Sequence, residues 1–144
     1  MQTWDEFFMD LAKMFSTRSK DVSTKCGAVI VDRDKVVIGS GYNGFPRGVA
    51  DTKALLENRP QKYPRVLHAE ENAILFASRI DLCGCTIYVW PLPPCGNCMA
   101  KIIQKKIGRV VTKKPTKGQR ERWGLSFDAA MDMATQTDTL IDFI

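Results

Sequence analysis

The residue types best suited to chemistry in this chain are one histidine, one glutamate and two cysteines. His68 begins a His-Ala-Glu motif that ends at Glu70, and Cys95 and Cys98 form a Cys-x-x-Cys pair preceded by proline. Zinc prefers imidazole nitrogen and thiolate sulfur, and a catalytic zinc keeps three protein ligands and leaves one position to water. We therefore predict that His68, Cys95 and Cys98 bind one zinc ion per chain, with Glu70 free to move protons.

Two simpler interpretations use the same residues. A lone histidine is most often structural, and a Cys-x-x-Cys pair alone is typical of redox dithiols or of structural zinc sites. A structural zinc needs four protein ligands, and the chain has no second histidine and no second Cys-x-x-Cys pair. A redox dithiol would not need the His-x-Glu motif. A catalytic zinc, which lowers the pKa of its water toward about 7, is therefore favoured over both, and over a degenerate, inactive site.

Length and composition predict one domain. With 144 residues, 44% of them hydrophobic, the chain can bury roughly two-thirds of its unfolded surface in a single core. The N-terminal residues are acidic and amphipathic, without a basic stretch followed by an apolar run, so we expect neither a signal peptide nor a membrane span. Five cysteines, two of them assigned to metal, suit a reducing compartment. We expect a cytoplasmic protein.

The remaining cysteines and the positive charge have simple explanations. Cys26, Cys83 and Cys85 are expected to be free thiols that pack, because unpaired cysteine behaves as a small hydrophobe. The net charge of +5 could serve an anionic substrate or nucleic acid, but the basic residues are scattered. Only residues 113–122 concentrate them, and such a run is usually a solvated loop and helix start. We do not expect nucleic acid as a partner.

Hydrophobic periodicity predicts a mixture of helices and strands. Four segments have apolar residues at helical spacing: 4–18, 68–78, 95–106 and 120–134. Five apolar, β-branched runs predict strands: 28–31, 36–39, 86–90, 109–112 and 139–144. The first two strands flank a polar turn and predict a hairpin. The helical crossover before the fourth strand predicts that it runs parallel to the third.

Two of the predicted helices begin at the predicted metal ligands. His68 starts one helix, and Cys95 and Cys98 lie in the first turn of another. The positive end of the helix dipole favours thiolate over thiol, which assists metal binding at neutral pH. An irregular stretch rich in Gly, Pro and Arg, residues 41–67, precedes His68. Because long loops in compact domains are usually functional or mobile, we expect a substrate loop here.

These motifs resemble, over essentially the whole chain, those of the cytidine and deoxycytidylate deaminase superfamily. His-x-Glu followed by Pro-Cys-x-x-Cys is the signature of zinc nucleobase deaminases. Further segments look like those of deoxycytidylate deaminases, the closer match: residues 18–21 before 27–31, residues 41–48, and residues 68–75. The segment 41–48, Gly-Tyr-Asn-Gly-Phe-Pro-Arg-Gly, is the most diagnostic. Related tRNA adenosine deaminases usually have a shorter segment in place of residues 51–67.

The resemblance implies a three-layer α/β/α sandwich with a mixed five-stranded sheet, as one zinc-dependent nucleotide deaminase domain over residues 1–144. It implies hydrolytic deamination of dCMP to dUMP, which supplies thymidylate synthesis. Glu70 would move a proton from water to the ring nitrogen N3 and then protonate the leaving amine. The resemblance also implies a homo-oligomer, often a hexamer, and dCTP and dTTP as candidate effectors.

Substrate contacts follow in part from the same resemblance. It implies that Asn43 hydrogen-bonds the deoxyribose or the pyrimidine edge and that the backbone of Ala69 contacts the base. The alternative for Asn43 is a turn residue, because Asn and Gly tolerate positive φ. A phosphate needs arginine, lysine or a helix N-terminus. Arg18, Lys20 and Arg47 are the candidates, although each could be a solvated surface charge.

Other functions use the same motifs. The zinc chemistry would also serve free cytidine, dCTP, a modified cytosine nucleotide or adenosine in RNA, and RNA binding would need a continuous basic groove. A zinc-bearing nucleotide-binding protein without turnover is a third class, disfavoured because zinc does not need Glu70 as a ligand. Family members often place an aromatic residue in the loop after the fourth strand, whereas residues 113–117 have none. Trp123 is the nearest, and it could stack on a base or pack in the core.

Overall fold

The computed structural model describes residues 1–144. Along the chain, helices and strands follow in this order: α1 Trp4–Ser16, β1 Gly27–Val31, β2 Val37–Tyr42, α2 Lys53–Glu57, α3 Arg59–Lys62, α4 Ala69–Leu75, β3 Thr86–Trp90, α5 Gly96–Gln104, β4 Arg109–Thr112, α6 Lys117–Gln136 and β5 Leu140–Phe143. None of the helices has the length and apolar character needed to span a bilayer.

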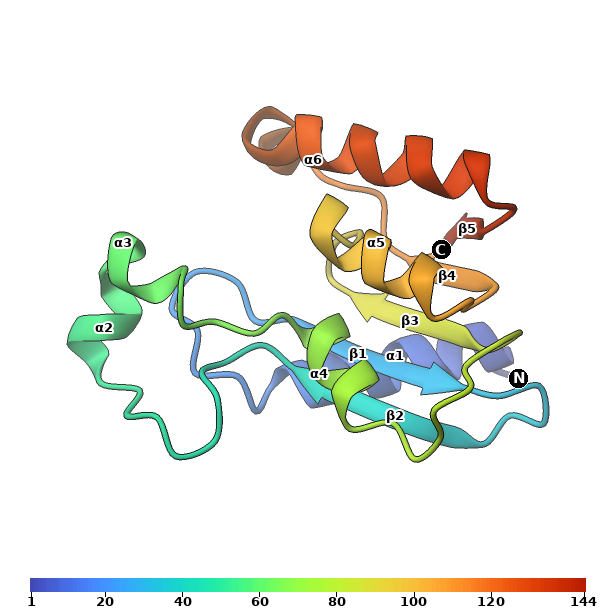
Figure 1. The fold of residues 1–144 in the computed structure, drawn as a ribbon, viewed down its shortest axis with the longest axis horizontal. Helices are drawn as coiled ribbons and strands as arrows, with labels where there is room; N and C mark the ends of the chain where they lie inside the picture. The colour runs from blue at the N-terminus through green and yellow to red at the C-terminus, as the bar shows by residue number, and fades with distance from the viewer.

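The strands form one mixed sheet in the order β2-β1-β3-β4-β5 (Figure 1). β1 pairs antiparallel with β2 and with β3, whereas β3 and β4, and β4 and β5, run parallel. The predicted hairpin and the predicted parallel third and fourth strands are confirmed. Each parallel pair is joined by a crossover helix, α5 before β4 and α6 before β5.

Helices cover both faces of the sheet, which confirms the predicted three layers (Figure 1). On one face, Phe8 and Ala12 of α1 pack in a cluster with Val29 and Tyr88. On the other face, a larger core joins residues of α4, α5 and α6 to Ile30 and its neighbours on the sheet. Neighbouring strand residues point to opposite faces, so Val29 and Ile30 belong to different clusters.

Charged groups fix the start of α1 to the sheet. Arg109 of β4 donates to both carboxylate oxygens of Asp5, at 2.9 and 2.7 Å, and the Tyr88 hydroxyl donates to Asp5 at 2.7 Å. The hydrogen bonds from Arg109 hold the pKa of Asp5 below its usual value. Such charge-assisted, bidentate contacts add direction to the apolar packing of this helix.

The structure differs from the sequence prediction mainly between residues 41 and 67. This stretch was predicted to be irregular, but it contains α2 and α3, which are capped by the side chains of Thr52 and Asn58. Helices this short are defined by caps, so hydrophobic periodicity could not reveal them. β2 also continues through Tyr42, which places Gly41 in the strand and not in a turn.

α4 approaches β2 closely because two positions of the strand lack side chains. A Cβ atom at Gly41 would lie 2.6 Å from the Ala69 carbonyl oxygen, and one at Gly39 would lie 2.6 Å from the Ala73 carbonyl oxygen. Ala69 and Ala73 are themselves fully buried. The helix that follows His68 can therefore rest on the sheet only where the strand carries glycine.

Gly41→Ala is expected to lower the free energy of unfolding by about 1–3 kcal/mol, because the backbone of α4 must move to admit the methyl group. It should also lower the zinc content, since α4 begins directly after His68. Gly44→Ala is the matched control, because no atom lies within 4 Å of a Cβ placed there. Denaturant unfolding and metal analysis of both variants test this. Equal stability of the two variants would contradict the prediction, because it would show that α4 can move away from β2 at no cost.

Candidate metal centre and substrate cavity

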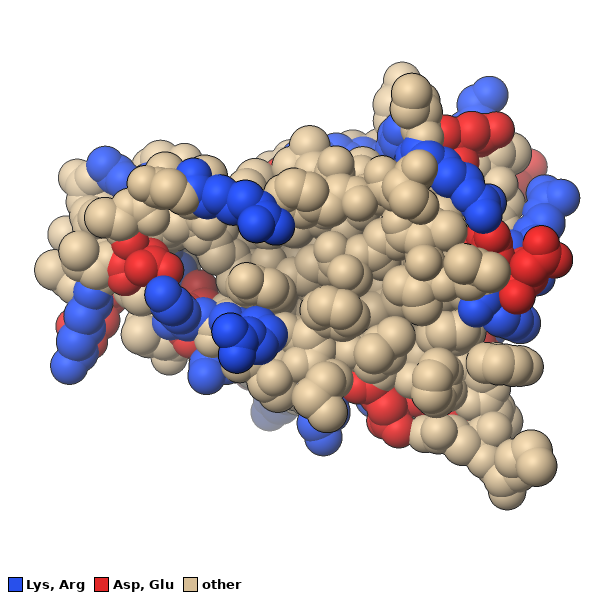
Figure 2. All heavy atoms as spheres, turned by 90° about the horizontal axis from the view of Figure 1, so that it is seen from below, with Lys and Arg blue, Asp and Glu red and all other residues tan.

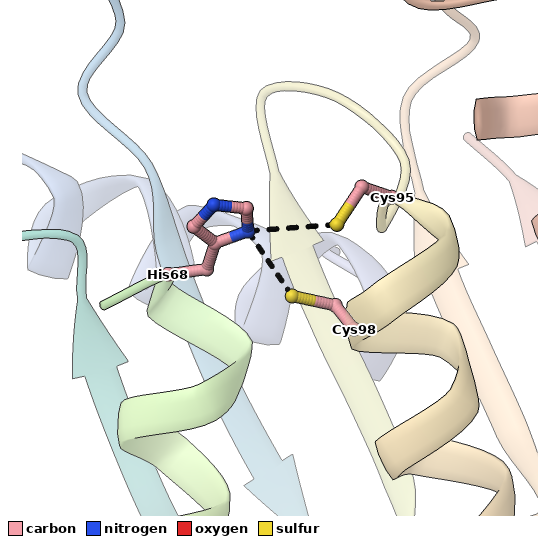
Figure 3. Close-up of side chains that lie close together, drawn as sticks. All are labelled: His68, Cys95 and Cys98. Atoms are coloured by element: carbon pink, nitrogen blue, oxygen red, sulfur yellow. Dashed lines mark hydrogen bonds between the residues drawn. The ribbon is translucent and has the colours of Figure 1, made fainter. Parts of the chain in front are cut away.

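His68, Cys95 and Cys98 come together where α4 and α5 begin (Figure 3). His68 and Cys95 are the N-cap residues of these two helices, and Cys98 lies in the first turn of α5. The His68 Nδ1 atom is 3.2 Å from the Cys98 sulfur and 3.6 Å from the Cys95 sulfur. All three candidate ligand atoms lie within 4.8 Å of one another.

The spacing and chemistry of this cluster fit zinc. Zinc bonds of about 2.0 Å to nitrogen and 2.3 Å to sulfur, at tetrahedral angles, place those atoms about 3.6 Å apart. A hydrogen bond from Cys98, with a further one from His68, lowers the pKa of the Cys95 thiol to about 4. The hydrogen bond to Cys95 raises the pKa of His68 to about 9. A metal ion would replace the protons that these groups share.

Glu70 lies beside the metal ligands without belonging to them. It is the second residue of α4, only 6% exposed, and it lines the same cavity as His68 and Cys95. Burial raises the pKa of Glu70 to about 7. A carboxyl group that gains and loses its proton near neutrality is suited to general acid–base work.

The next glutamate has a different role. Glu71 accepts a hydrogen bond from the backbone N–H of His68 at 2.8 Å and pairs with Lys101 of α5 at 2.9 Å. It therefore closes the cap of α4 and ties that helix to α5. Hydrogen bonds from His68 and Lys101 outweigh the effect of burial and lower the pKa of Glu71. Of the two adjacent carboxylates, only Glu70 faces the cavity.

A cavity of about 300 Å³ opens at this cluster, which is enough for a small ligand. Its walls are formed by residues of α3, α4 and α6 and by residues of the loops before β1 and after β3. His68, Ala69, Glu70 and Cys95 line it together. The structure thus brings the predicted metal ligands, the predicted proton carrier and one predicted base contact to one place.

Asn43 also lines the cavity, but its side chain holds the loop before β1. Its Oδ1 atom accepts from the backbone N–H of Cys26 at 2.8 Å, and its Nδ2 atom donates to the Thr24 carbonyl oxygen at 2.9 Å. The Ser19 hydroxyl donates to the Asn43 carbonyl oxygen at 2.8 Å. One Nδ2 hydrogen is left for a ligand. Asn43 therefore shapes the cavity wall, and a substrate contact stays a prediction.

The cations predicted to bind phosphate, Arg18, Lys20 and Arg47, do not line this cavity. All three are exposed. Lys20 pairs with Asp51 at 3.1 Å, and the Arg47 guanidinium group lies 4.8 Å from the centre of the Phe76 ring. The sequence identifies these residues as cations that could bind a phosphate, but it does not determine where their long side chains point.

Other cations line the cavity instead. Arg59 and Lys62 come from α3, inside the stretch predicted to be a substrate loop. Arg122 comes from the start of α6, inside the basic run predicted to be solvated. Tyr63 and Trp123 follow two of these residues and also line the cavity. The available sequence signal was the pairing of a basic residue with an aromatic one, in Lys62-Tyr63 and Arg122-Trp123.

A mixed sheet between helices, with a His/Cys/Cys cluster at two helix N-termini and a buried glutamate beside it, is the arrangement of zinc-dependent nucleobase deaminases. Residues 2–114 match the family model described as the cytidine and deoxycytidylate deaminase zinc-binding region. The chain therefore belongs to the cytidine and deoxycytidylate deaminase family. The family model describes a zinc-binding region, and the cluster of His68, Cys95 and Cys98 fits zinc, so both indicate zinc as the cofactor.

Individual relatives agree with this assignment. A protein of Aliivibrio fischeri named as an uncharacterized deaminase is 43% identical over 98% of this chain and 93% of its own length. Human deoxycytidylate deaminase is 42% identical over 75% of this chain, and the match spans 63% of the human protein. The crystal structure of the dCMP deaminase from cyanophage S-TIM5, in apo form, covers 100% of both chains with a TM-score of 0.77 and 24% identity. That structure supports the fold.

Cys95→Ser and Cys98→Ser are each expected to lose zinc, because a serine hydroxyl does not supply the thiolate ligand at neutral pH. Cys83→Ser is the matched control, since Cys83 is an exposed free cysteine outside the cluster. Elemental analysis of the purified proteins should find about one zinc per chain in the wild type and the control. Full zinc content in both cluster variants would contradict the three-ligand site.

Proposed function

We propose that this protein catalyses the zinc-dependent hydrolytic deamination of dCMP to dUMP, with release of ammonia. The observation that carries the proposal is the buried Glu70 carboxyl group beside three metal ligands, in a cavity that also presents cations. The relatives support the choice of substrate, because the human relative is a deoxycytidylate deaminase. The product dUMP would supply thymidylate synthesis.

The roles of the residues follow from their positions. His68, Cys95 and Cys98 would hold zinc, which when bound supplies an activated water as the nucleophile. Glu70 takes one proton from the attacking water and delivers it to N3 of cytosine, then takes the second proton from the hydroxyl group now on C4 and delivers it to the leaving amine. One carboxyl group suffices because it returns to the carboxylate form after each delivery, and burial raises the pKa of Glu70 to about 7, which suits both steps. The walls of the cavity hold the base against these groups.

The cations favour a nucleotide over a nucleoside. Arg59 and Arg122 reach the cavity from different elements, α3 and α6, and neither forms an ion pair within the chain. A phosphate dianion is best bound by such unpaired guanidinium groups. Arg18, Lys20 and Arg47 stay predictions from the sequence, and they are disfavoured in the single chain because none of them lines the cavity.

The face of the molecule shown in Figure 2 has no continuous basic groove. On the face shown in Figure 2, lysine and arginine side chains lie toward the two ends of the molecule, with acidic residues among them and a largely uncharged middle. RNA binding would call for a continuous basic groove. Deamination of another cytosine nucleotide or of cytidine would use the same zinc and Glu70, so the substrate assay decides among these.

Further parts of the proposal rest on family membership. They are assembly into a homo-oligomer, such as the hexamer that the family resemblance implies, control by dCTP and dTTP, and a single deaminase domain over residues 1–144 in the cytoplasm. Cys26, Cys83 and Cys85, which lie outside the metal cluster, are not paired in disulfides, which supports a reducing compartment.

Glu70→Gln is expected to keep zinc and to lower kcat about 10²- to 10⁴-fold, because glutamine cannot carry the proton. Glu71→Gln is the neighbouring control, since a glutamine at this position can still accept from the His68 N–H. The loss of ultraviolet absorbance on conversion of dCMP to dUMP measures both. Full activity of Glu70→Gln would refute the assigned role, whatever the control does.

Arg122→Ala is expected to raise the KM for dCMP about tenfold while changing that for deoxycytidine little, because one charge-assisted contact to phosphate is lost. Arg18→Ala and Arg47→Ala should have smaller effects, since neither residue lines the cavity. Steady-state kinetics on both substrates compare the three variants. If Arg18→Ala or Arg47→Ala raised the KM for dCMP more than Arg122→Ala did, and left that for deoxycytidine unchanged, the phosphate would be bound by the residues predicted from the sequence.

A further inference from the structure

Lys62 and Asp21 form a buried ion pair in the wall of the cavity. The Lys62 ammonium nitrogen lies 3.0 Å from each of the two carboxylate oxygens of Asp21. The two side chains are only 7% and 6% exposed, yet both residues line the cavity. Lys62 ends α3, whereas Asp21 lies in the loop between α1 and β1, so the pair joins two distant segments.

Stability alone is a weak explanation for this pair. Taking two charges out of water costs about as much as their attraction returns, and apolar replacements of buried pairs are often neutral or stabilising. The same loop is already held by neutral hydrogen bonds, those that Asn43 makes to Cys26 and Thr24. Because both residues of this pair line the cavity, a ligand explains the pair better than stability does.

One N–H donor of the Lys62 ammonium group has no partner within the chain. Asp21 has further partners, because its Oδ1 atom also accepts from the backbone N–H groups of Ser23 at 2.8 Å and Thr24 at 3.1 Å. An ammonium group has three N–H donors, and the contacts of Lys62 go to Asp21 alone. At least one donor therefore remains for a molecule in the cavity. Arg59, one turn earlier on α3, lines the same cavity.

We propose that Lys62 selects nucleotide over nucleoside by donating this remaining N–H to the 5′-phosphate, while Asp21 holds the ammonium group in place. The inference rests on the proposed function and names a specificity residue for it. Before substrate binds, Asp21 neutralises Lys62, so the wall carries no unbalanced buried charge. When the nucleotide binds, its phosphate adds a second anionic partner to the same cation.

The two members of the pair should therefore respond in opposite directions. Losing Lys62 removes the cation from the phosphate, whereas losing the charge of Asp21 removes an anion that repels the phosphate. A pair that served only as a latch between α3 and the loop would instead impair nucleotide and nucleoside substrates equally, whichever member was changed.

The test compares kcat/KM for dCMP and for deoxycytidine in Lys62→Met, Asp21→Asn and the wild type. Lys62→Met should lower kcat/KM for dCMP about ten- to hundredfold and change that for deoxycytidine less than about threefold. Asp21→Asn, which keeps an acceptor for the Ser23 and Thr24 N–H groups, should retain or increase the preference for dCMP. Lys53→Met is the control, because Lys53 forms an exposed pair with Glu57 on α2.

Parallel losses on both substrates in Lys62→Met and Asp21→Asn would overturn the proposal, as would an unchanged preference in Lys62→Met. If Lys62→Met does not fold, the double variant Asp21→Asn/Lys62→Gln keeps a neutral hydrogen-bonded pair and should fold while losing the preference for dCMP. A wild-type protein with no preference for dCMP would contradict the proposed function itself. A wild-type preference that the double variant retains would contradict only the role of Lys62.

Discussion

The meeting of two helix N-termini over one sheet is the constraint on which the site depends. The first N–H groups of a helix lack partners within it and carry partial positive charge, so they favour anions. Here α4 and α5 begin at His68 and Cys95, and each helix start has a side-chain partner: Glu71 of α4 itself accepts from the His68 N–H, and Ser126 of α6 accepts from the Gly96 N–H. Thiolates and a carboxylate can therefore be held together at a position that is largely shielded from water.

Packing against the sheet then sets where those helix ends lie. Gly39 and Gly41 let α4 rest directly on β2, and the parallel pairing of β3 and β4 obliges α5 to cross the same face as α4. The metal ligands are thus positioned by the sheet, the most buried part of the chain. The opposite wall of the cavity comes from α3 and from the start of α6, which are held by caps and side-chain contacts.

This division explains what the sequence could and could not predict. His68, Cys95, Cys98 and Glu70 could be selected because zinc chemistry limits the residue types and spacings, and the strands could be located because buried strands are continuous apolar runs. The cations that line the cavity could not be located in the same way. Arginine and lysine are common on surfaces, and whether one reaches a cavity depends on tertiary packing, so the sequence did not single out Arg59, Lys62 and Arg122. The irregular backbone at Trp123 within α6 likewise has no sequence signature.

The buried charged groups of the cavity have two different environments: one lacks a partner of opposite charge, and the other has one. Glu70 is buried without a cationic side chain bonded to it, so its pKa rises to about 7 and its protonation can change during a reaction. Lys62 is buried with Asp21 at 3.0 Å, so each charge has a partner of opposite sign. Proton transfer needs the first arrangement, and recognition of an anion needs the second. Because Glu70 lies on α4 and Lys62 lies on α3, outside the sheet, substitutions in α3 are expected to leave the position of the Glu70 carboxyl group unchanged.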